Sequence, residues 1–257
     1  MNLALNFSET GNYKSMSQKA RVVTESWAIE NLYCPVCGSH KLVQYAANKP
    51  VADFYCSDCS SDFELKSKFS CSSKDIFTAK IVDGAYRTMI ERITSQNNPN
   101  LLYMQYNAET VTNLLLIPCF FFLPDIIEER PPLKETARRA GWTGCNIKLE
   151  NVPSIGKISI IYNGIVENAK TVVSKYEKAK PLQINNINAR GWLMDVFICV
   201  ERLGKIFNLS EIYDFENELS RKHENNKNVR PKIRQQLQLL RNKGIIEFLG
   251  NGEYRKI

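Results

Sequence analysis

The chain has 257 residues, with 34 Lys or Arg against 27 Asp or Glu and a formal net charge of +7. This length suits one or two domains, and 44% hydrophobic with 24% charged residues predicts packed cores and excludes global disorder. The only histidines, His40 and His223, exclude an H-E-x-x-H zinc site. The absence of Walker A and G-x-G-x-x-G motifs leaves no support for a nucleotide cofactor.

The N-terminus lacks the basic start and long apolar run of a signal peptide. The most apolar stretch, residues 114–123, is ten residues long and contains Pro118, whereas a membrane-spanning helix needs about 20 residues. We therefore expect a cytoplasmic protein without a membrane partner. Disulfides are disfavoured in that compartment, so paired cysteines point to a metal.

Helical spacing of apolar residues predicts helices over residues 17–31 and 83–94. Residues 34–68, between them, are rich in cysteine and strand-like. Further strands are predicted over residues 101–106, 113–117 and 157–162, the last followed by an Asn163-Gly164 turn. Helices mixed with strands predict an α/β (α+β) domain, which we place at residues 1–182.

Proline and asparagine residues at 180–188 indicate a linker. Beyond it, three helical stripes follow, the second capped by Ser210 and the third beginning near Pro231 and ending at Gly244. Their apolar residues are Trp192, Val196, Cys199, Val200 and Leu203, then Ile212, Phe215 and Leu219, then Ile233, Leu237 and Leu240. A β-hairpin turning at residues 250–252 closes the chain, which predicts a winged-helix domain over residues 183–257.

Residues 227–257 hold eight basic and two acidic residues, a net charge of +6. If the apolar stripe of the third helix faces the core, its polar residues face outward and become candidate DNA contacts: Lys232, Arg234, Gln235, Gln238, Asn242 and Lys243. Glutamine suits an adenine edge, whereas arginine and lysine suit phosphates. The hairpin adds Asn251, Tyr254, Arg255 and Lys256. A solvated helix face is the alternative for the residues of the third helix.

Two C-x2-C pairs, Cys34/Cys37 and Cys56/Cys59, are separated by 18 residues. Each pair on a tight turn aims both sulfurs at one ion, and this spacing is typical of a four-thiolate zinc site. Closed coordination makes the Zn²⁺ structural, with His40 a ligand only if one cysteine is not used. The remaining cysteines are interpreted as small core residues: Cys71, Cys119, Cys145 and Cys199.

Asp53 lies three residues before Cys56, and Glu64-Leu65-Lys66 begins five residues after Cys59. Glu64 and Lys66 share one face of a strand because side chains alternate, and the second C-x2-C turn brings Asp53 opposite them. Asp53 and Glu64 then suit Mg²⁺, with Lys66 orienting or activating the attacking water in phosphodiester cleavage. An ordinary salt-bridged strand face is the alternative.

Residues 136–142 place Arg138, Arg139 and Trp142 in a loop-like segment. The arginines suit phosphates, although a helix-terminal arginine pair and a core tryptophan would give the same sequence.

Asp53 with Glu64-Leu65-Lys66 resembles the PD-(D/E)xK nuclease superfamily, and the whole chain resembles the DpnI-like, Dam-replacing family of methyl-directed restriction endonucleases. The matching stretches span both domains: residues 13–15, 17–21, the four cysteines, 50–55, 63–68, 83–86, 136–142, 144–147 and 233–238.

The resemblance implies a PD-(D/E)xK catalytic domain with an embedded zinc site, followed by a winged helix. It implies Mg²⁺-dependent cleavage of double-stranded DNA at GATC sites with N6-methyladenine, catalysed by Asp53, Glu64 and Lys66. The backbone carbonyl of Leu65 joins the Mg²⁺ ligands, and Trp142 contacts the methyl-adenine. Gln18 and Glu25 are interpreted as a solvated helix face, although such nucleases sometimes place a metal or lysine partner there.

Two alternatives stay open. One is a zinc-ribbon and winged-helix regulator that binds DNA without catalysis, and the other is a nuclease of the same superfamily acting on a different DNA substrate, such as a junction or a repair intermediate. A palindromic target suits a dimer, but two DNA-reading domains in one chain let a monomer act, and we expect a monomer in solution.

Overall fold

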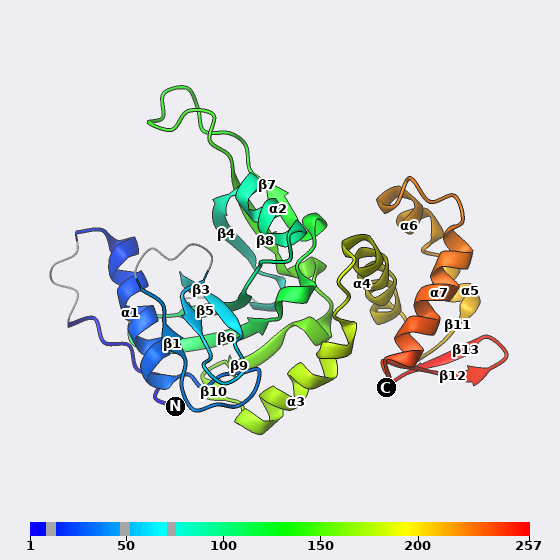
Figure 1. The fold of residues 1–257 in the computed structure, drawn as a ribbon, viewed down its shortest axis with the longest axis horizontal. Helices are drawn as coiled ribbons and strands as arrows, with labels where there is room; N and C mark the ends of the chain where they lie inside the picture. Colours follow the sequence, from blue (N-terminus) through cyan, green and yellow to red (C-terminus); the bar gives the residue numbers. More distant parts are fainter. Residues whose placement is uncertain (9–13, 47–51, 71–75) are drawn as a thin grey trace. The chain divides into compact units, whose positions relative to one another are not determined.

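The computed structural model describes residues 1–8, 14–46, 52–70 and 76–257, which form two compact units (Figure 1). The N-terminal unit comprises Met1–Glu150 and Ile155–Lys180, and the C-terminal unit comprises Asn151–Ser154 and Pro181–Ile257. Tyr13, Pro50, Val51 and Cys71, which the sequence analysis used, lie outside the described residues. Within these ranges, no helix has both the length and the apolar character needed to cross a bilayer.

The N-terminal unit is built on a seven-stranded sheet with the order β1-β2-β3-β5-β6-β9-β10. Its strands are β1 (Val43–Gln44), β2 (Phe54–Tyr55), β3 (Asp62–Phe69), β5 (Asn100–Tyr106), β6 (Val111–Ile117), β9 (Ile158–Tyr162) and β10 (Ile165–Val166). The β3–β5 pair is parallel and the other neighbours are antiparallel. Every residue of β5 is buried, as expected of a central strand covered on both faces.

Two helices pack on this sheet: α1 (Met16–Asn31) contacts β3, and α3 (Ala169–Ala179) contacts β9. The helix predicted at residues 17–31 is therefore confirmed, and it buries Val23, Trp27 and Ala28. The Asn163-Gly164 turn is confirmed as well, because both residues have positive φ angles between β9 and β10. The sequence analysis did not predict α3.

A second, antiparallel sheet has the order β4-β8-β7, with β4 at Lys80–Ala85, β8 at Gly144–Lys148 and β7 at Ile127–Glu129. Helix α2 (Tyr86–Thr94) contacts all three strands. The predicted start of this helix at residue 83 is wrong, because Asp83 belongs to β4. Residues 130–143 join β7 to β8 and extend away from both sheets (Figure 1); we call them the arm.

Short 3-10 helices lie in several of the described connections: Ile76–Thr78, Cys119–Phe121, Pro124–Ile126, Leu149–Asn151, Ser154–Gly156 and Lys180–Leu182.

The C-terminal unit has the element order of a winged helix. Its helices are α4 (Ile187–Arg202), α5 (Leu209–Tyr213), α6 (Glu216–Lys222) and α7 (Val229–Asn242), and its strands are β11 (Ile206–Asn208), β12 (Ile246–Gly250) and β13 (Glu253–Lys256), paired in the order β11-β13-β12. Most residues of the predicted apolar stripes lie in the core, with Val196, Ile233 and Leu237 fully buried, whereas Leu203 and Phe215 are partly exposed.

Two local predictions in this unit have different outcomes. The third helix does hold Pro231 in its first turn and ends before Gly244, whose φ is +71°. The second helix is instead divided into α5 and α6, and its cap is Asn208 rather than Ser210. The backbone N–H of Asn208 donates to the Glu211 carboxylate at 2.6 Å, which completes a reciprocal capping box two residues earlier than expected.

Candidate active site

The two C-x2-C pairs form two turns with the same backbone pattern. In each turn the first cysteine N–H donates to the carbonyl five residues later, from Cys34 to Ser39 and from Cys56 to Ser61. The residue after the second cysteine is left-handed in both, Gly38 at φ +82° and Ser60 at φ +58°. The chain therefore presents two equivalent turns, one after α1 and one between β2 and β3.

The four thiols of these turns gather at one point, where all ligand atoms lie within 4.8 Å of one another. The Sγ atoms are 3.6 Å apart in the Cys34–Cys59 pair and in the Cys37–Cys56 pair. Tetrahedral Zn²⁺ with bonds of about 2.3 Å requires sulfurs about 3.8 Å apart, whereas a disulfide requires about 2.05 Å. The thiols therefore fit a structural zinc ion, and His40 is not part of this group.

The other described cysteines are not grouped in this way. Cys145 and Cys199 are buried, as predicted for small core residues, whereas Cys119 is partly exposed.

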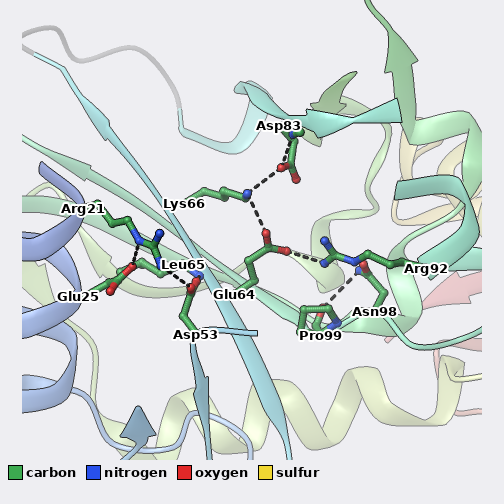
Figure 2. Close-up of polar contacts among 11 residues, drawn as sticks. Arg21, Glu25, Asp53, Glu64, Leu65, Lys66, Asp83, Arg92, Asn98 and Pro99 are labelled. Atoms are coloured by element: carbon green, nitrogen blue, oxygen red, sulfur yellow. Dashed lines mark hydrogen bonds and ion pairs between the residues drawn. The ribbon is translucent and has the colours of Figure 1, made fainter. Parts of the chain in front are cut away.

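Asp53 lies where β2 begins, against the edge of β3 (Figure 2). Its backbone N–H donates to the carbonyl of Phe63 at 2.9 Å, and its Oδ2 accepts the N–H of Leu65 at 2.8 Å. The carboxylate thus takes over an N–H that β2 is too short to reach. Because the N–H and C=O of one strand residue point to the same edge, the Leu65 carbonyl also belongs to the edge that Asp53 occupies.

Glu64 and Lys66 lie on one face of β3, as alternation predicts. Lys66 Nζ is 2.8 Å from Glu64 Oε1. The second C-x2-C turn, between β2 and β3, reverses the chain so that Asp53 lies beside Glu64 and Lys66 (Figure 2). The structure therefore brings together the three residues that the sequence analysis selected.

Two further residues complete the group, which we call the charged cluster: Asp53, Glu64, Lys66, Asp83 and Arg92. Lys66 Nζ is 2.7 Å from Asp83 Oδ1, and Arg92 Nη2 is 2.6 Å from Glu64 Oε2 (Figure 2). Asp83 comes from β4 and Arg92 from α2. Neither residue was selected for this site from the sequence. The Asp83-Gly84 pair, within the matching stretch 83–86, was the one sequence feature that could have indicated a role for Asp83.

Two pKa values in the charged cluster are shifted upward, for different reasons. Burial would lower the pKa of Lys66, but the carboxylates of Glu64 and Asp83 raise it to about 12, so its ammonium is charged at neutral pH. Burial raises the pKa of Asp53 above its ordinary value, and Glu25 and Glu64 add to that increase. The Leu65 N–H and Arg21 oppose it.

Helix α1 lines the other side of Asp53. Arg21 lies 2.5 Å from Glu25 and 3.8 Å from Asp53, and Gln44 donates to Glu25 at 3.1 Å. The side chain of Glu25 is only 14% exposed, so its interpretation as part of a solvated helix face is wrong. A cavity of about 750 Å³ runs between α1 and β3, and its wall includes Asp53, Glu64 and Lys66.

The arm carries the next group of candidates. Arg138 and Arg139 are exposed, and Trp142 is partly exposed, unlike a core residue. The Arg139 guanidinium lies 4.8 Å from the centre of the Trp142 ring. Two atoms of this ring lie within 3.0 Å of the position that a side chain on Gly144 would occupy, so the indole rests on bare backbone at the start of β8.

In the C-terminal unit, Gln235 and Gln238 are exposed on α7, as predicted. Lys232 donates to Gln235 at 2.8 Å, and Arg234 donates to the hydroxyl of Tyr213 on α5.

Three of the four residues predicted in the hairpin, Tyr254, Arg255 and Lys256, contact other groups of the unit, whereas Asn251 is exposed. Arg255 pairs with Glu247 at 2.8 Å, and Tyr254 stacks on Phe207 with ring centres 5.5 Å apart. Lys256 and Lys243 donate to backbone carbonyls within the same unit. The two glutamines of α7 share their exposure with other predicted contacts, among them Asn242 on the same helix and Asn251 in the hairpin.

A family model described as the Dam-replacing family matches residues 1–185. A second model, described as the Dam-replacing HTH domain, matches residues 188–256. The chain belongs to the Dam-replacing family. It is therefore a member of a family of methyl-directed restriction endonucleases, with a C-terminal helix-turn-helix domain for binding DNA. The charged cluster lies within the first match and α7 within the second.

Proposed function

We propose that the chain is a Mg²⁺-dependent type II restriction endonuclease that hydrolyses double-stranded DNA at GATC sites carrying N6-methyladenine. Residues 1–182 form its PD-(D/E)xK catalytic domain and residues 183–257 its winged helix. One observation carries the proposal: Asp53, Glu64 and Lys66 converge at one cavity in a member of the Dam-replacing family.

The donor set at this cavity fits Mg²⁺. Asp53 and Glu64 supply carboxylate oxygens, and Leu65 supplies a backbone carbonyl at the same strand edge, which are the hard ligands that Mg²⁺ takes. Within the charged cluster itself, three carboxylates face two cations, so one negative charge is in excess. Bound there, Mg²⁺ supplies polarisation of the scissile phosphate.

The chain's own residues supply the rest of the reaction geometry. Lys66, held charged between Glu64 and Asp83, donates hydrogen bonds that orient the attacking water. The water oxygen then forms a bond to phosphorus while the bond from phosphorus to the leaving sugar oxygen breaks. The proton that the water loses passes to solvent, and the leaving oxygen takes up a proton from solvent. Arg92 fixes the second oxygen of Glu64, so this carboxylate keeps one orientation during the attack.

Two regions read the DNA in this proposal. Arg138 and Arg139 of the arm contact phosphates, and Trp142 offers an apolar face to the methyl group. On α7, Gln235 and Gln238 read base edges, with Lys232 and Arg234 on phosphates, while Tyr254 and Arg255 of the hairpin contact the backbone. Because one chain holds both regions, a monomer is sufficient in solution.

The test is cleavage of three duplexes, identical except that their GATC site is methylated on both strands, on one strand or on neither. We expect Mg²⁺-dependent cutting of the methylated duplexes and none of the unmethylated one. Glu64→Gln removes the cutting, whereas Glu177→Gln, a matched change on the exposed face of α3, leaves it unchanged.

Each other outcome has a clear meaning. Equal cutting of all three duplexes would overturn methyl direction, and preferential cutting of branched DNA would indicate a different substrate. Salt-sensitive binding without cutting, unaffected by changes at Asp53 or Glu64, would indicate a DNA-binding regulator.

A further inference from the structure

Asp83 stands out in the charged cluster because it belongs to the second sheet, whereas Glu64 and Lys66 belong to β3 and Asp53 directly precedes β2. Its side chain is only 5% exposed, and its Oδ1 lies 2.7 Å from Lys66 Nζ. This contact joins the proposed catalytic strand to a sheet that holds none of the predicted catalytic residues.

The backbone of β4 is irregular at this point. The register between β4 and β8 shifts between Asp83 and Ala85, so Gly84 forms a β-bulge. The N–H of Gly84 donates to Asp83 Oδ1 at 2.6 Å. A bulge bends its strand and re-aims a side chain, and bulges are frequent beside active sites. Here the bulge and its hydrogen bond fix Asp83 toward Lys66 (Figure 2).

Only one of the two carboxylate oxygens of Asp83, Oδ1, has hydrogen-bond partners among the described residues. Its Oδ2 is buried and has no hydrogen-bond partner among the described residues. A buried polar atom without a partner costs about 1–3 kcal/mol, and such groups in native proteins often have a functional explanation. Asp83 therefore bears a cost that a purely structural contact would avoid.

We propose that Asp83 is a positioning residue for Lys66 in the proposed cleavage reaction, on whose existence this role rests. Lys66 has two carboxylate partners, and one of them, Glu64, is a proposed Mg²⁺ ligand. When Glu64 Oε1 binds a metal, its hold on Lys66 weakens while Arg92 keeps Oε2 in place, and Asp83 is the partner that keeps the ammonium in position. The role of Asp83 is thus greatest in the metal-loaded, reacting enzyme.

Asp83→Asn tests this role in the full chain. The substitution is nearly isosteric, and its amide oxygen still accepts from Gly84, while the second oxygen has no partner to lose. We therefore expect the variant to fold, with Tm within about 3 °C of the parent. Rates are measured below the unfolding transition, so they refer to folded protein.

The readout separates chemistry from binding. With saturating Mg²⁺ and methylated duplex, we expect Asp83→Asn to lower the single-turnover cleavage rate by about 10- to 100-fold. The Kd for the same duplex, measured without metal, stays within about twofold, because Asp83 acts on the reacting state only. Glu128→Gln is the matched control, because it breaks the 2.8 Å Lys80–Glu128 ion pair of the same sheet and is expected to leave the rate unchanged.

The results distinguish this role from the proposed function. A parent chain that does not cut methylated DNA overturns the proposed function and the role together. A parent that cuts, with an Asp83→Asn variant that cuts equally fast, overturns the role alone. A lower rate explained fully by lower Tm or weaker DNA binding would assign Asp83 to structure and likewise contradict the positioning role.

Discussion

The charged cluster and the surface of α7 differ in how their side chains are held. In the cluster, Asp83 is 5% and Glu64 16% exposed, and each is paired with a cation of the same site. Around α7, Arg230 is 60% exposed and pairs with Glu216, a neighbour outside the predicted contacts. The first region is fixed before any ligand arrives, whereas the second must exchange its partners for DNA.

From this difference we expect catalysis and DNA recognition to be carried by separate regions of the chain. Groups that stabilise a transition state act best when they are already oriented and shielded from water. Exposed ion pairs, in contrast, contribute about 0–1 kcal/mol and are readily exchanged. The comparison predicts that changes in the cluster affect the rate, and that changes on α7 affect affinity and sequence preference.

The largest expected effect comes from removing zinc, which would break the fixed region as a whole. Structural zinc contributes about 10–16 kcal/mol in small zinc-binding peptides, and here the second cysteine turn joins β2, which follows Asp53, to β3. We expect Cys56→Ser to lower Tm strongly and to abolish cleavage, as measured by calorimetry and a duplex assay. Cys119→Ser, outside the thiol group, serves as control, and equal behaviour of the two variants would contradict the zinc assignment.

Lys66→Met is expected to act on chemistry alone. Removing a cation that faces developing charge costs about 10²–10³-fold in rate, while the affinity for methylated duplex is retained. Single-turnover cleavage and a binding titration measure the two quantities. Lys178→Met on α3 is the matched control. A variant that loses affinity and rate in equal proportion would show that Lys66 binds DNA instead.

Two residues of α7, the exposed Gln238 and the partly exposed Lys232, should behave differently when each is replaced. Gln238→Ala should reduce discrimination between the correct and altered sites by about 1–3 kcal/mol, because a base contact is lost. Lys232→Ala should weaken binding to all sequences alike and reduce the salt dependence of log K by about one. Identical effects of the two variants on every duplex would remove base reading from Gln238.

The smallest effect concerns the two cysteine turns, which differ at one left-handed position. Ser60 has φ +58° where the first turn has Gly38. Since a left-handed residue with a side chain costs about 1–2 kcal/mol, Ser60→Gly should raise the unfolding free energy by about 0.5–1 kcal/mol, after the entropic cost of glycine. Ser60→Ala keeps the strain and is the control, so an equal gain from both variants would exclude backbone strain as the cause.

The sequence predicted those parts of the site that depend on short-range geometry. Alternation along β3 placed Glu64 beside Lys66, and the turn between β2 and β3 returned Asp53 to them. The grouping of the four thiols followed from the same kind of spacing. In the C-terminal unit, apolar stripes predicted the buried faces of α4 and α7 because helical periodicity is local.

The remaining parts depend on contacts that no local pattern contains. Asp83 reaches Lys66 through the second sheet and a bulge, and the helical spacing after Ala85 led the sequence analysis to place Asp83 on α2. Arg92 reaches Glu64 only after α2 has packed. Glu25 lies on a helix face that α1 turns toward the cavity rather than toward solvent.

One measurement tests the separation of chemistry from reading most directly: cleavage and binding of the same methylated GATC duplex by Glu64→Gln, with Mg²⁺ present for cleavage and absent for binding. We expect the Glu64→Gln variant to bind the methylated duplex as tightly as the parent, to prefer it still over the unmethylated one, and not to cut it. A variant that still cuts at the parent rate would contradict the assignment of catalysis to the charged cluster.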